Sequence, residues 1–239
     1  MNKENFSKPI ELTDFAVKDA FWEPEMELVR TEVIPYQWNA LNNNIEGATP
    51  SFCMHNYKVA GELNEARIKY GKDYKKKPIP FFWGVFPETD EDTSENFYGF
   101  VFQDSDFSKW VEAVAYSLTR HPDKKLEKTA DEAIDIVAKA QLESGYLDTF
   151  YIINDEDKKF TNLRDAHELY CFGHLTEGAV AYFKATGKDK LLNVARKYAD
   201  FIFSKFGNEE GKIHGYPGHE TAEMALVRLY EVTNDKKYL

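Results

Sequence analysis

The chain has 239 residues, of which 43% are hydrophobic, 15% aromatic and 30% charged, so it can bury a sizeable core. This composition excludes a disordered chain and a disulfide-stapled miniprotein. With 41 acidic and 30 basic residues, the formal net charge is −11, which argues against nucleic acid or a membrane surface as the partner, because both require clustered Lys and Arg.

The N-terminal stretch MNKENFSKPIELTDFAV lacks the unbroken apolar core of a signal peptide, and no window approaches ~18 apolar residues. Both cysteines, Cys53 and Cys171, lie in apolar surroundings without a CxxC partner, which predicts buried free thiols. We therefore expect a cytoplasmic protein.

Residues 66–98 read as a long inserted loop. The basic stretch KDYKKKP (72–78) lies close to the acidic stretch ETDEDTSE (88–95), which favours a solvated loop over a nucleic-acid patch. Long ordered loops usually serve a site or an interface. Phe82 and Trp83 could line a sugar site or anchor the loop, and anchoring is the favoured interpretation.

Apolar residues recur at helical spacing through most of the chain after residue 100, and no stretch alternates over a convincing length as a strand does. The stretches SGYLDT (144–149) and EEGKIHG (209–215) interrupt the helical pattern like turns. The sequence therefore predicts an all-α fold.

Two helical segments repeat along the chain. EAVAYSLTRHPDKKL (112–126) lines up with GAVAYFKATGKDKLL (178–192) and more weakly with MALVRLYEVTNDKKYL (224–239). TADEAIDIVAKAQLESGYLD (129–148) likewise matches VARKYADFIFSKFGNEEGKIH (194–214). The repeating unit is a helical hairpin, and stacked hairpins form either an open solenoid or a closed ring.

A polar cluster precedes the first helix of each unit: FQDSD (102–106), RDAHE (164–168) and PGHE (217–220). Helix N-termini carry unpaired N–H groups and partial positive charge, so in a closed ring these clusters would converge at one end of the central funnel. A helix cap explains any one cluster alone. Three clusters in register favour a ligand site.

Several chemistries are weighed against the motifs. No GxSxG, GxxxxGK[ST] or GxGxxG occurs, which leaves a serine nucleophile and nucleotide binding unsupported. The HE dipeptides at 167 and 219 lack the second histidine of HExxH, and His167 and His174 lie ~10 Å apart along one helix, too far for one metal. No metal site is expected. A carboxylate pair for glycoside hydrolysis stays open, with Asp104 and Asp106 as candidates by position only.

Five blocks together resemble the N-terminal half of glycoside hydrolase family 127, the β-L-arabinofuranosidases, over most of residues 20–239. They are VIPYQWNALN (33–42), VFQDSDFSKWVEAVAY (101–116), AQLESGYLDTFY (140–151), AHELYCFGHLTEGAVAYFKATGKDKLL (166–192) and EEGKIHGYPGHETAEMAL (209–226). The resemblance implies an (α/α)6 barrel followed by β-sandwich domains. It also implies hydrolysis of terminal β-L-arabinofuranosyl groups of plant-type glycans with retention.

The family mechanism implied by the resemblance uses a cysteine thiolate held on zinc, with two further cysteines and a glutamate as ligands, and a separate glutamate as acid/base. All these positions lie beyond the equivalent of Leu239. We therefore expect no catalytic residue, cofactor or metal ligand in this chain. Residues 1–239 would form the N-terminal portion of one catalytic domain, an incomplete (α/α)6 barrel that is inactive alone and self-associates through unpaired helix faces.

The residues that can be carried over from the family face the carbohydrate substrate. His167 in AHELY and His219 in GHE match family histidines that contact the arabinofuranose, and Gln103 and Asp104 in FQDSD lie at the same rim. His214 is expected to be a loop-packing neighbour. Two alternatives stay open: a non-catalytic helical-hairpin scaffold that binds proteins, and another (α/α)6 sugar enzyme, such as a 2-epimerase or an unsaturated glucuronyl hydrolase.

Overall fold

The computed structural model describes residues 10–71, 81–87 and 95–239. Its N-terminal elements are α1 (Trp22–Leu28), a π-helical turn (Val29–Val33), α2 (Ile34–Leu41) and α3 (Cys53–Tyr70), followed by the antiparallel strands β1 (Gly84–Val85) and β2 (Gly99–Phe100). The remaining elements are α4 (Asp104–Arg120), α5 (Lys124–Ala140), α6 (Thr149–Asn154), α7 (Glu168–Thr186), α8 (Lys190–Lys205) and α9 (Thr221–Thr233), with 3-10 turns at Glu156–Lys158 and Lys236–Tyr238. The predicted all-α fold is confirmed.

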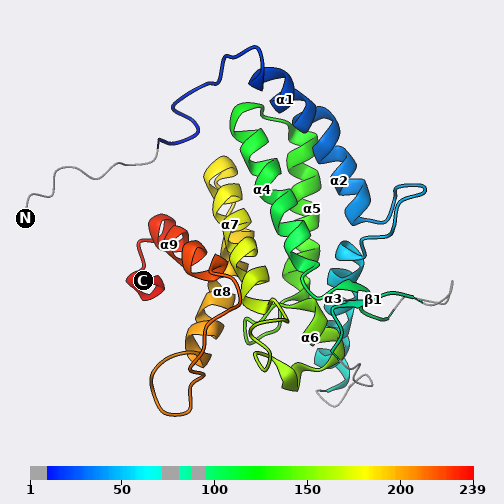
Figure 1. Cartoon of the computed structure of the whole chain (residues 1–239), viewed down its shortest axis with the longest axis vertical. Coiled ribbons are helices and arrows are strands. Elements are labelled where there is room, and N and C mark those ends of the chain that lie inside the picture. Colours follow the sequence, from blue (N-terminus) through cyan, green and yellow to red (C-terminus); the bar gives the residue numbers. More distant parts are fainter. Residues whose placement is uncertain (1–9, 72–80, 88–94) are drawn as a thin grey trace, which may run out of the picture.

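The helices form two curved layers (Figure 1). In one layer α4 packs against α2 and α7, and α7 packs against α9; in the other, α5 packs against α3 and α8. Since α4–α5 and α7–α8 are hairpins that cross between the layers, the chain forms an arc of hairpins, as in an (α/α) barrel. Among the described helices, none has both the length and the hydropathy needed to cross a membrane.

The predicted repeat at 112–126 and 178–192 is confirmed, because each segment is a helix, a short turn and a second helix. The first turn, 121–123, ends at Asp123, whose Oδ1 accepts hydrogen bonds from the backbone N–H groups of Lys125 (2.8 Å) and Leu126 (3.1 Å) and caps α5. The second turn, 187–189, connects α7 to α8.

Buried apolar side chains from both layers form one continuous core. Its largest fully buried side chains include Tyr57, Phe107, Tyr146, Phe172, Tyr182 and Tyr198. Cys53 and Cys171 are free and buried, as predicted. Residues 66–70 of the predicted insertion belong to α3, whereas the stretches 72–80 and 88–94 lie outside the described residues.

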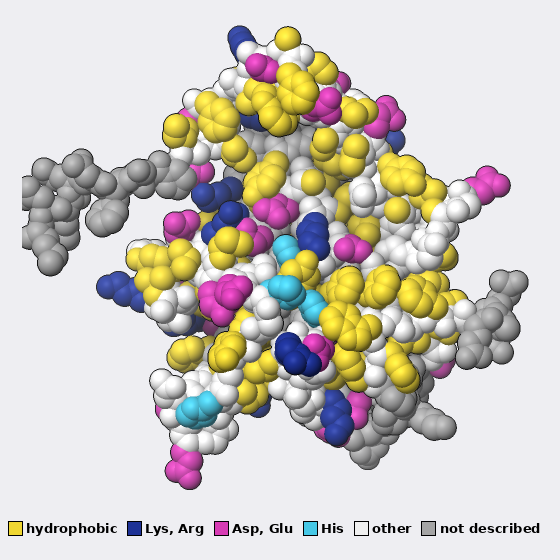
Figure 2. Space-filling view, in the orientation of Figure 1, with side chains coloured by type: hydrophobic (Ala, Val, Ile, Leu, Met, Phe, Trp, Pro, Cys, Tyr) yellow, Lys and Arg dark blue, Asp and Glu magenta, His cyan; other side chains and the backbone are white. Residues whose placement is uncertain are grey.

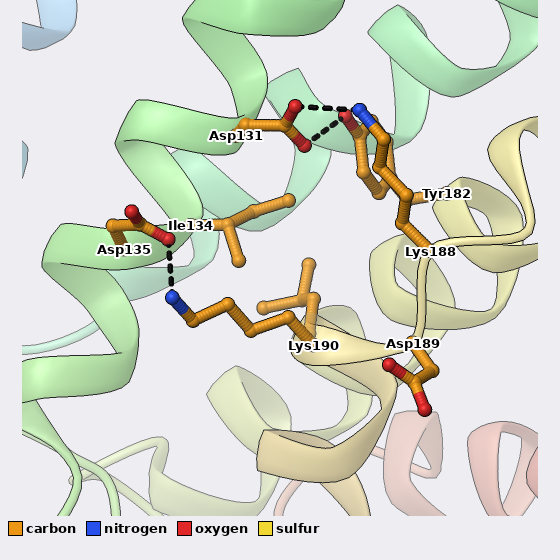
Figure 3. Close-up of a pocket in the computed structure, with 8 residues that line it drawn as sticks. Asp131, Ile134, Asp135, Tyr182, Lys188, Asp189 and Lys190 are labelled. Atoms are coloured by element: carbon orange, nitrogen blue, oxygen red, sulfur yellow. Dashed lines mark hydrogen bonds and ion pairs between the residues drawn. The ribbon is translucent and has the colours of Figure 1, made fainter.

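Ion pairs and a hydrogen bond connect the α4–α5 and α7–α8 hairpins around a pocket of about 290 Å³ (Figure 3). Lys188 donates to Asp131 (2.6 Å), Lys190 donates to Asp135 (2.5 Å), and the Tyr182 hydroxyl donates to Asp131 (2.8 Å). The lysine side chains are 42% and 58% exposed, so each ion pair contributes about 1 kcal/mol or less. Because these contacts connect α5 with the α7–α8 hairpin, we interpret the pocket as a structural contact between the two repeats.

Candidate functional site

The structure brings two histidines together at the N-terminal ends of neighbouring helices. His167 directly precedes α7, and His219 lies two residues before α9 begins at Thr221. Their Nε2 atoms are 3.3 Å apart and their ring centroids 5.1 Å apart. Figure 2 shows histidine side chains gathered at the centre of this face. The convergence of the second and third polar clusters is therefore observed directly.

The hydrogen bonds assign a direction to this pair. His167 Nδ1 lies 2.6 Å from the carbonyl oxygen of Asp165, which can only accept, so Nδ1 carries the hydrogen. In a neutral ring, His167 Nε2 is then an acceptor, and His219 Nε2 donates to it. The pair thus presents one acceptor and one donor to a hydroxyl group that can replace their mutual bond.

A buried carboxyl group fixes the loop that ends in His167. Glu168, the first residue of α7, is 1% exposed; it accepts hydrogen bonds from the Phe160 N–H (2.9 and 3.1 Å) and the Tyr146 hydroxyl (2.5 Å). Burial raises the pKa of Glu168 to about 7. Phe160 and His167, at the two ends of this loop, both have left-handed backbones, with φ of 59° and 60°.

Gly218 places His219 beside His167. Its N–H donates to the Leu163 carbonyl oxygen (3.4 Å), and a Cβ at this position would lie 2.6 Å from the Arg164 carbonyl oxygen. Only glycine therefore allows the 217–219 segment to lie this close to the loop before α7. The two histidine-bearing loops are packed together through backbone contacts.

Tyr170 lies one turn further along α7 and contacts three histidines. Its ring centroid is 5.5 Å from that of His167, 5.2 Å from that of His219 and 4.5 Å from that of His174. Its hydroxyl accepts a hydrogen bond from Lys109 Nζ (2.9 Å) on α4. Burial, then the Lys109 cation and His219, lower the pKa of His174 to about 4. We call Lys109, Tyr170 and His174 the polar floor of the site.

Gln103 lies at the mouth of α4, but its side chain is buried and used within the protein. The amide nitrogen donates to Asp106 and to Ser51 Oγ (3.3 Å), and the amide oxygen accepts from the Phe100 N–H (3.2 Å). Gln103 therefore supports strand β2, and its hydrogen bonds do not extend to the histidine pair.

Asp104 is also turned inward. Its two carboxyl oxygens accept from the hydroxyl (2.6 Å) and the N–H (2.8 Å) of Thr149, at the start of α6. Burial raises its pKa to about 6. Asp148 is 1% exposed, and burial, together with the nearby carboxyl groups of Asp104 and Glu168, raises its pKa. Asp104 thus belongs to a buried carboxyl cluster behind the mouth of the helices.

Other expectations need correction. His214 is exposed rather than packed in its loop. Phe82 and Trp83 are 56% and 51% exposed, so neither is buried as a loop anchor would be. The Trp83 ring lies 5.3 Å from the His167 ring, which places it at the site. Sequence reasoning also missed Tyr170, although its position three residues after His167, in the first turn of the helix that follows, was a usable signal.

The described residues do not fit a thiolate zinc centre. Within 10–71, 81–87 and 95–239, no group of three or more His, Cys, Asp or Glu side chains is arranged to hold a metal ion. Cys53 and Cys171 lie on different helices, and burial raises the pKa of both thiols, which disfavours the thiolate that zinc binds.

An arc of helical hairpins with polar groups gathered at one end defines a class of protein, the (α/α) barrel domains. The family model for the GH127 catalytic domain of β-L-arabinofuranosidase matches residues 14–239. The chain belongs to this family.

Individual relatives agree with the assignment. The chain is 38% identical over 227 residues to the non-reducing end β-L-arabinofuranosidase of Bifidobacterium longum, covering 93% of this chain and 32% of that protein. It superposes on a GH127 β-L-arabinofuranosidase from Geobacillus stearothermophilus with a TM-score of 0.78 and 46% identity, over 93% of this chain and 31% of that one. It also superposes on a second GH127 β-arabinofuranosidase with a TM-score of 0.76 and 32% identity, over 96% of this chain and 32% of that one. The chain thus spans about a third of the length of these relatives.

Proposed function

We propose that this chain is the sugar-binding part of a glycoside hydrolase that removes terminal β-L-arabinofuranosyl groups from plant-type glycans. Family membership supports the reaction class. The observation that carries the proposal is the His167–His219 pair, an acceptor and a donor 3.3 Å apart at the open ends of two helices. A furanose hydroxyl both donates and accepts, so it can bond to both rings at once.

The four expected substrate residues then take two kinds of role. His167 and His219 contact the sugar, with the polar floor beneath them. Gln103 and Asp104 support the site from behind, because Gln103 bonds to the Phe100 N–H and Asp104 bonds to Thr149.

We propose that the nucleophile, the acid/base and the zinc ligands implied by the family resemblance lie outside residues 1–239. The poor fit of Cys53 and Cys171 to a thiolate centre supports this arrangement. The chain alone would then bind the sugar without hydrolysing it. A cytoplasmic location also stays a prediction.

Calorimetric titration with methyl β-L-arabinofuranoside tests the proposal. His167→Ala and His219→Ala should each weaken binding by ~1–3 kcal/mol, because each change leaves a sugar hydroxyl without its partner. The matched controls are His121→Ala and His214→Ala, which remove exposed histidines away from the pair. Equal affinities in all five proteins would contradict the assignment.

A second proposal concerns self-association and rests on the edge formed by α1, the π-helical turn and α2. This edge exposes seven large hydrophobic side chains: Phe21, Trp22, Met26, Leu28, Val29, Val33 and Tyr36. Exposed apolar patches of this kind mark interaction surfaces, as a protein-binding scaffold would require. Sedimentation should detect oligomers that dissociate in Trp22→Glu. A monomeric wild-type chain would contradict self-association.

A further inference from the structure

Four aromatic side chains form a continuous strip that begins at the histidine pair and leads away from it. The aromatic strip consists of Trp83, Phe102, Phe100 and Phe86. Trp83 and Phe102 each lie 5.3 Å from the His167 ring, Phe100 lies 5.2 Å from Phe102, and Phe86 lies 5.4 Å from Phe100. Figure 2 shows hydrophobic side chains gathered beside the histidines.

The strip is exposed although its members are apolar. Trp83 is 51% exposed, Phe86 45% and Phe100 42%. Single exposed hydrophobic residues need no explanation, but a contiguous row that touches a polar site is typical of a ligand-binding surface.

The local structure holds these rings in place. Phe100 and Phe102 stack with an interplanar angle of 2°, and Phe86 meets Phe100 edge to face. Phe100 pairs with Gly84 across the two strands, and a Cβ on Gly84 would lie 3.0 Å from the Phe86 ring and 3.1 Å from the Phe100 ring. The absence of a side chain at Gly84 therefore lets both rings lie close to β1, and a Cβ there would require them to shift. The Gln103 amide oxygen fixes the Phe100 N–H from behind.

Two groups of different chemistry contact the histidine pair. The polar floor meets both rings through Tyr170, whose hydroxyl accepts from the Lys109 ammonium. The aromatic strip meets His167 through Trp83 and Phe102, and its four members carry no charge. Hydroxyl groups of a terminal sugar need hydrogen-bonding partners, whereas the bond to the rest of the glycan must lead towards solvent.

We propose that the aromatic strip binds the second sugar ring of the glycan, the one attached to the terminal arabinofuranose on its leaving-group side. This inference rests on the proposed function and adds a specificity surface to it. The C–H face of an uncharged sugar ring packs on aromatic rings, which supply a large apolar area in a fixed position. The strip thus selects substrates by the sugar to which the terminal arabinofuranose is attached.

The test compares two ligands on the same 239-residue chain: methyl β-L-arabinofuranoside, and a disaccharide in which β-L-arabinofuranose is attached to a second arabinofuranose. Calorimetry should show tighter binding of the disaccharide. Phe100→Ala and Phe86→Ala should each reduce that preference about two- to tenfold, the range expected for one aromatic contact. Both should leave the affinity for the methyl glycoside unchanged, since neither ring contacts a histidine directly. Phe203→Ala, which removes a 61% exposed ring on α8, is the matched control.

The outcomes separate the two proposals. If the methyl glycoside binds but the wild-type chain does not prefer the disaccharide, the proposed role of the aromatic strip is contradicted, while the histidine site is still supported. The same conclusion follows if both variants keep the preference. If the methyl glycoside does not bind to the wild-type chain, the proposed function fails and the strip falls with it. Phe100→Leu keeps the apolar volume without the ring, so it must lose the preference even if Phe100→Ala unfolds. A wild-type dimer that Phe100→Leu makes monomeric would show that the strip is a subunit contact, and would overturn the proposal.

Discussion

The N-terminal ends of α4 and α7 occupy equivalent places in the repeat, but the residues that precede these helices contact different groups. The residue before α4, Gln103, has a right-handed helical backbone (φ −59°, ψ −29°) and its amide is buried against β2. The residue before α7, His167, has a left-handed backbone (φ 60°, ψ 17°) and its ring faces His219. The repeat places a polar residue before each helix, but the two residues differ both in backbone conformation and in the groups to which their side chains bond.

Both helices nevertheless begin with a buried acid that holds a neighbouring segment. Asp104 binds Thr149 at the start of α6, and Glu168 binds the Phe160 N–H and the Tyr146 hydroxyl. A carboxyl group in the first turn also interacts favourably with the helix dipole. Both helix starts therefore have a buried acid, but the acids support different segments: α6 at the start of α4, and the loop that carries His167 at the start of α7.

Removal of the buried acid Glu168 at the start of α7 should have the largest effect on the free energy of unfolding. Glu168→Ala leaves the buried Phe160 N–H and Tyr146 hydroxyl without an acceptor, which should lower the free energy of unfolding by about 3 kcal/mol in urea titrations. It should also separate the rings of His167 and His219, detected as a change in their NMR shifts. Glu220→Ala, which removes an exposed acid just before α9, is the control and should change the free energy of unfolding by less than about 0.5 kcal/mol. A Glu168→Ala protein with wild-type stability would show that this buried acid is dispensable.

The contribution of Asp104, the buried acid at the start of α4, to the free energy of unfolding should depend on pH. Burial raises the pKa of Asp104 from 3.8 to about 6, so the folded state binds more protons than the unfolded state between these values. This contribution to stability is full below about pH 4 and is lost as pH rises through 6. In Asp104→Asn the amide oxygen can accept from the Thr149 N–H and the amide NH2 can donate to the Thr149 hydroxyl oxygen, so the uncharged variant should stabilise the protein by about 1–3 kcal/mol at pH 8 and flatten the profile from pH 4 to 6. Urea unfolding of the wild-type chain and of Asp104→Asn from pH 4 to 8 measures this difference. If the free energy of unfolding depends on pH equally in both proteins, the raised pKa of Asp104 is contradicted.

Part of this fold and of the candidate site could be predicted from the sequence. Helical periodicity and the repeat at 112–126 and 178–192 predicted the hairpins, because side-chain spacing directly reflects helix geometry. The proximity of His167 and His219 was predicted from the polar clusters that precede equivalent helices of the repeat. The inward position of the Gln103 side chain was not predictable, because it accepts from the Phe100 N–H of a two-residue strand with no alternating pattern and donates to Ser51, which is distant in the sequence.

The distance between His167 and His219 should depend on Gly218. Gly218→Ala would place a Cβ 2.6 Å from the Arg164 carbonyl oxygen, so the loop before α9 must move away and take His219 with it. Such a shift should cost about 1–2 kcal/mol of stability and weaken binding of methyl β-L-arabinofuranoside about tenfold. Gly215→Ala tests the same loop, but its Cβ would meet only the end of the Leu163 side chain, which can rotate. Equal affinities for the two variants would show that the histidine spacing does not depend on this backbone contact.

The smallest effect should come from His174, whose pH response has the opposite sign to that of Asp104. Burial, then Lys109 and His219, lower the pKa of His174 from 6.5 to about 4, so the folded state binds fewer protons than the unfolded state between these values. Its contribution is therefore full above about pH 6.5 and is lost as pH falls towards 4. Because the ring is only partly buried, solvent screens the effect, and His174→Gln should relieve less than about 1 kcal/mol at pH 5. NMR should show the His174 ring neutral from pH 5 to 8 in the wild-type chain. A ring that becomes protonated above pH 6 would show that burial and the nearby Lys109 ammonium do not disfavour the imidazolium, and the contrast between the polar floor with its lysine cation and the uncharged aromatic strip would no longer hold.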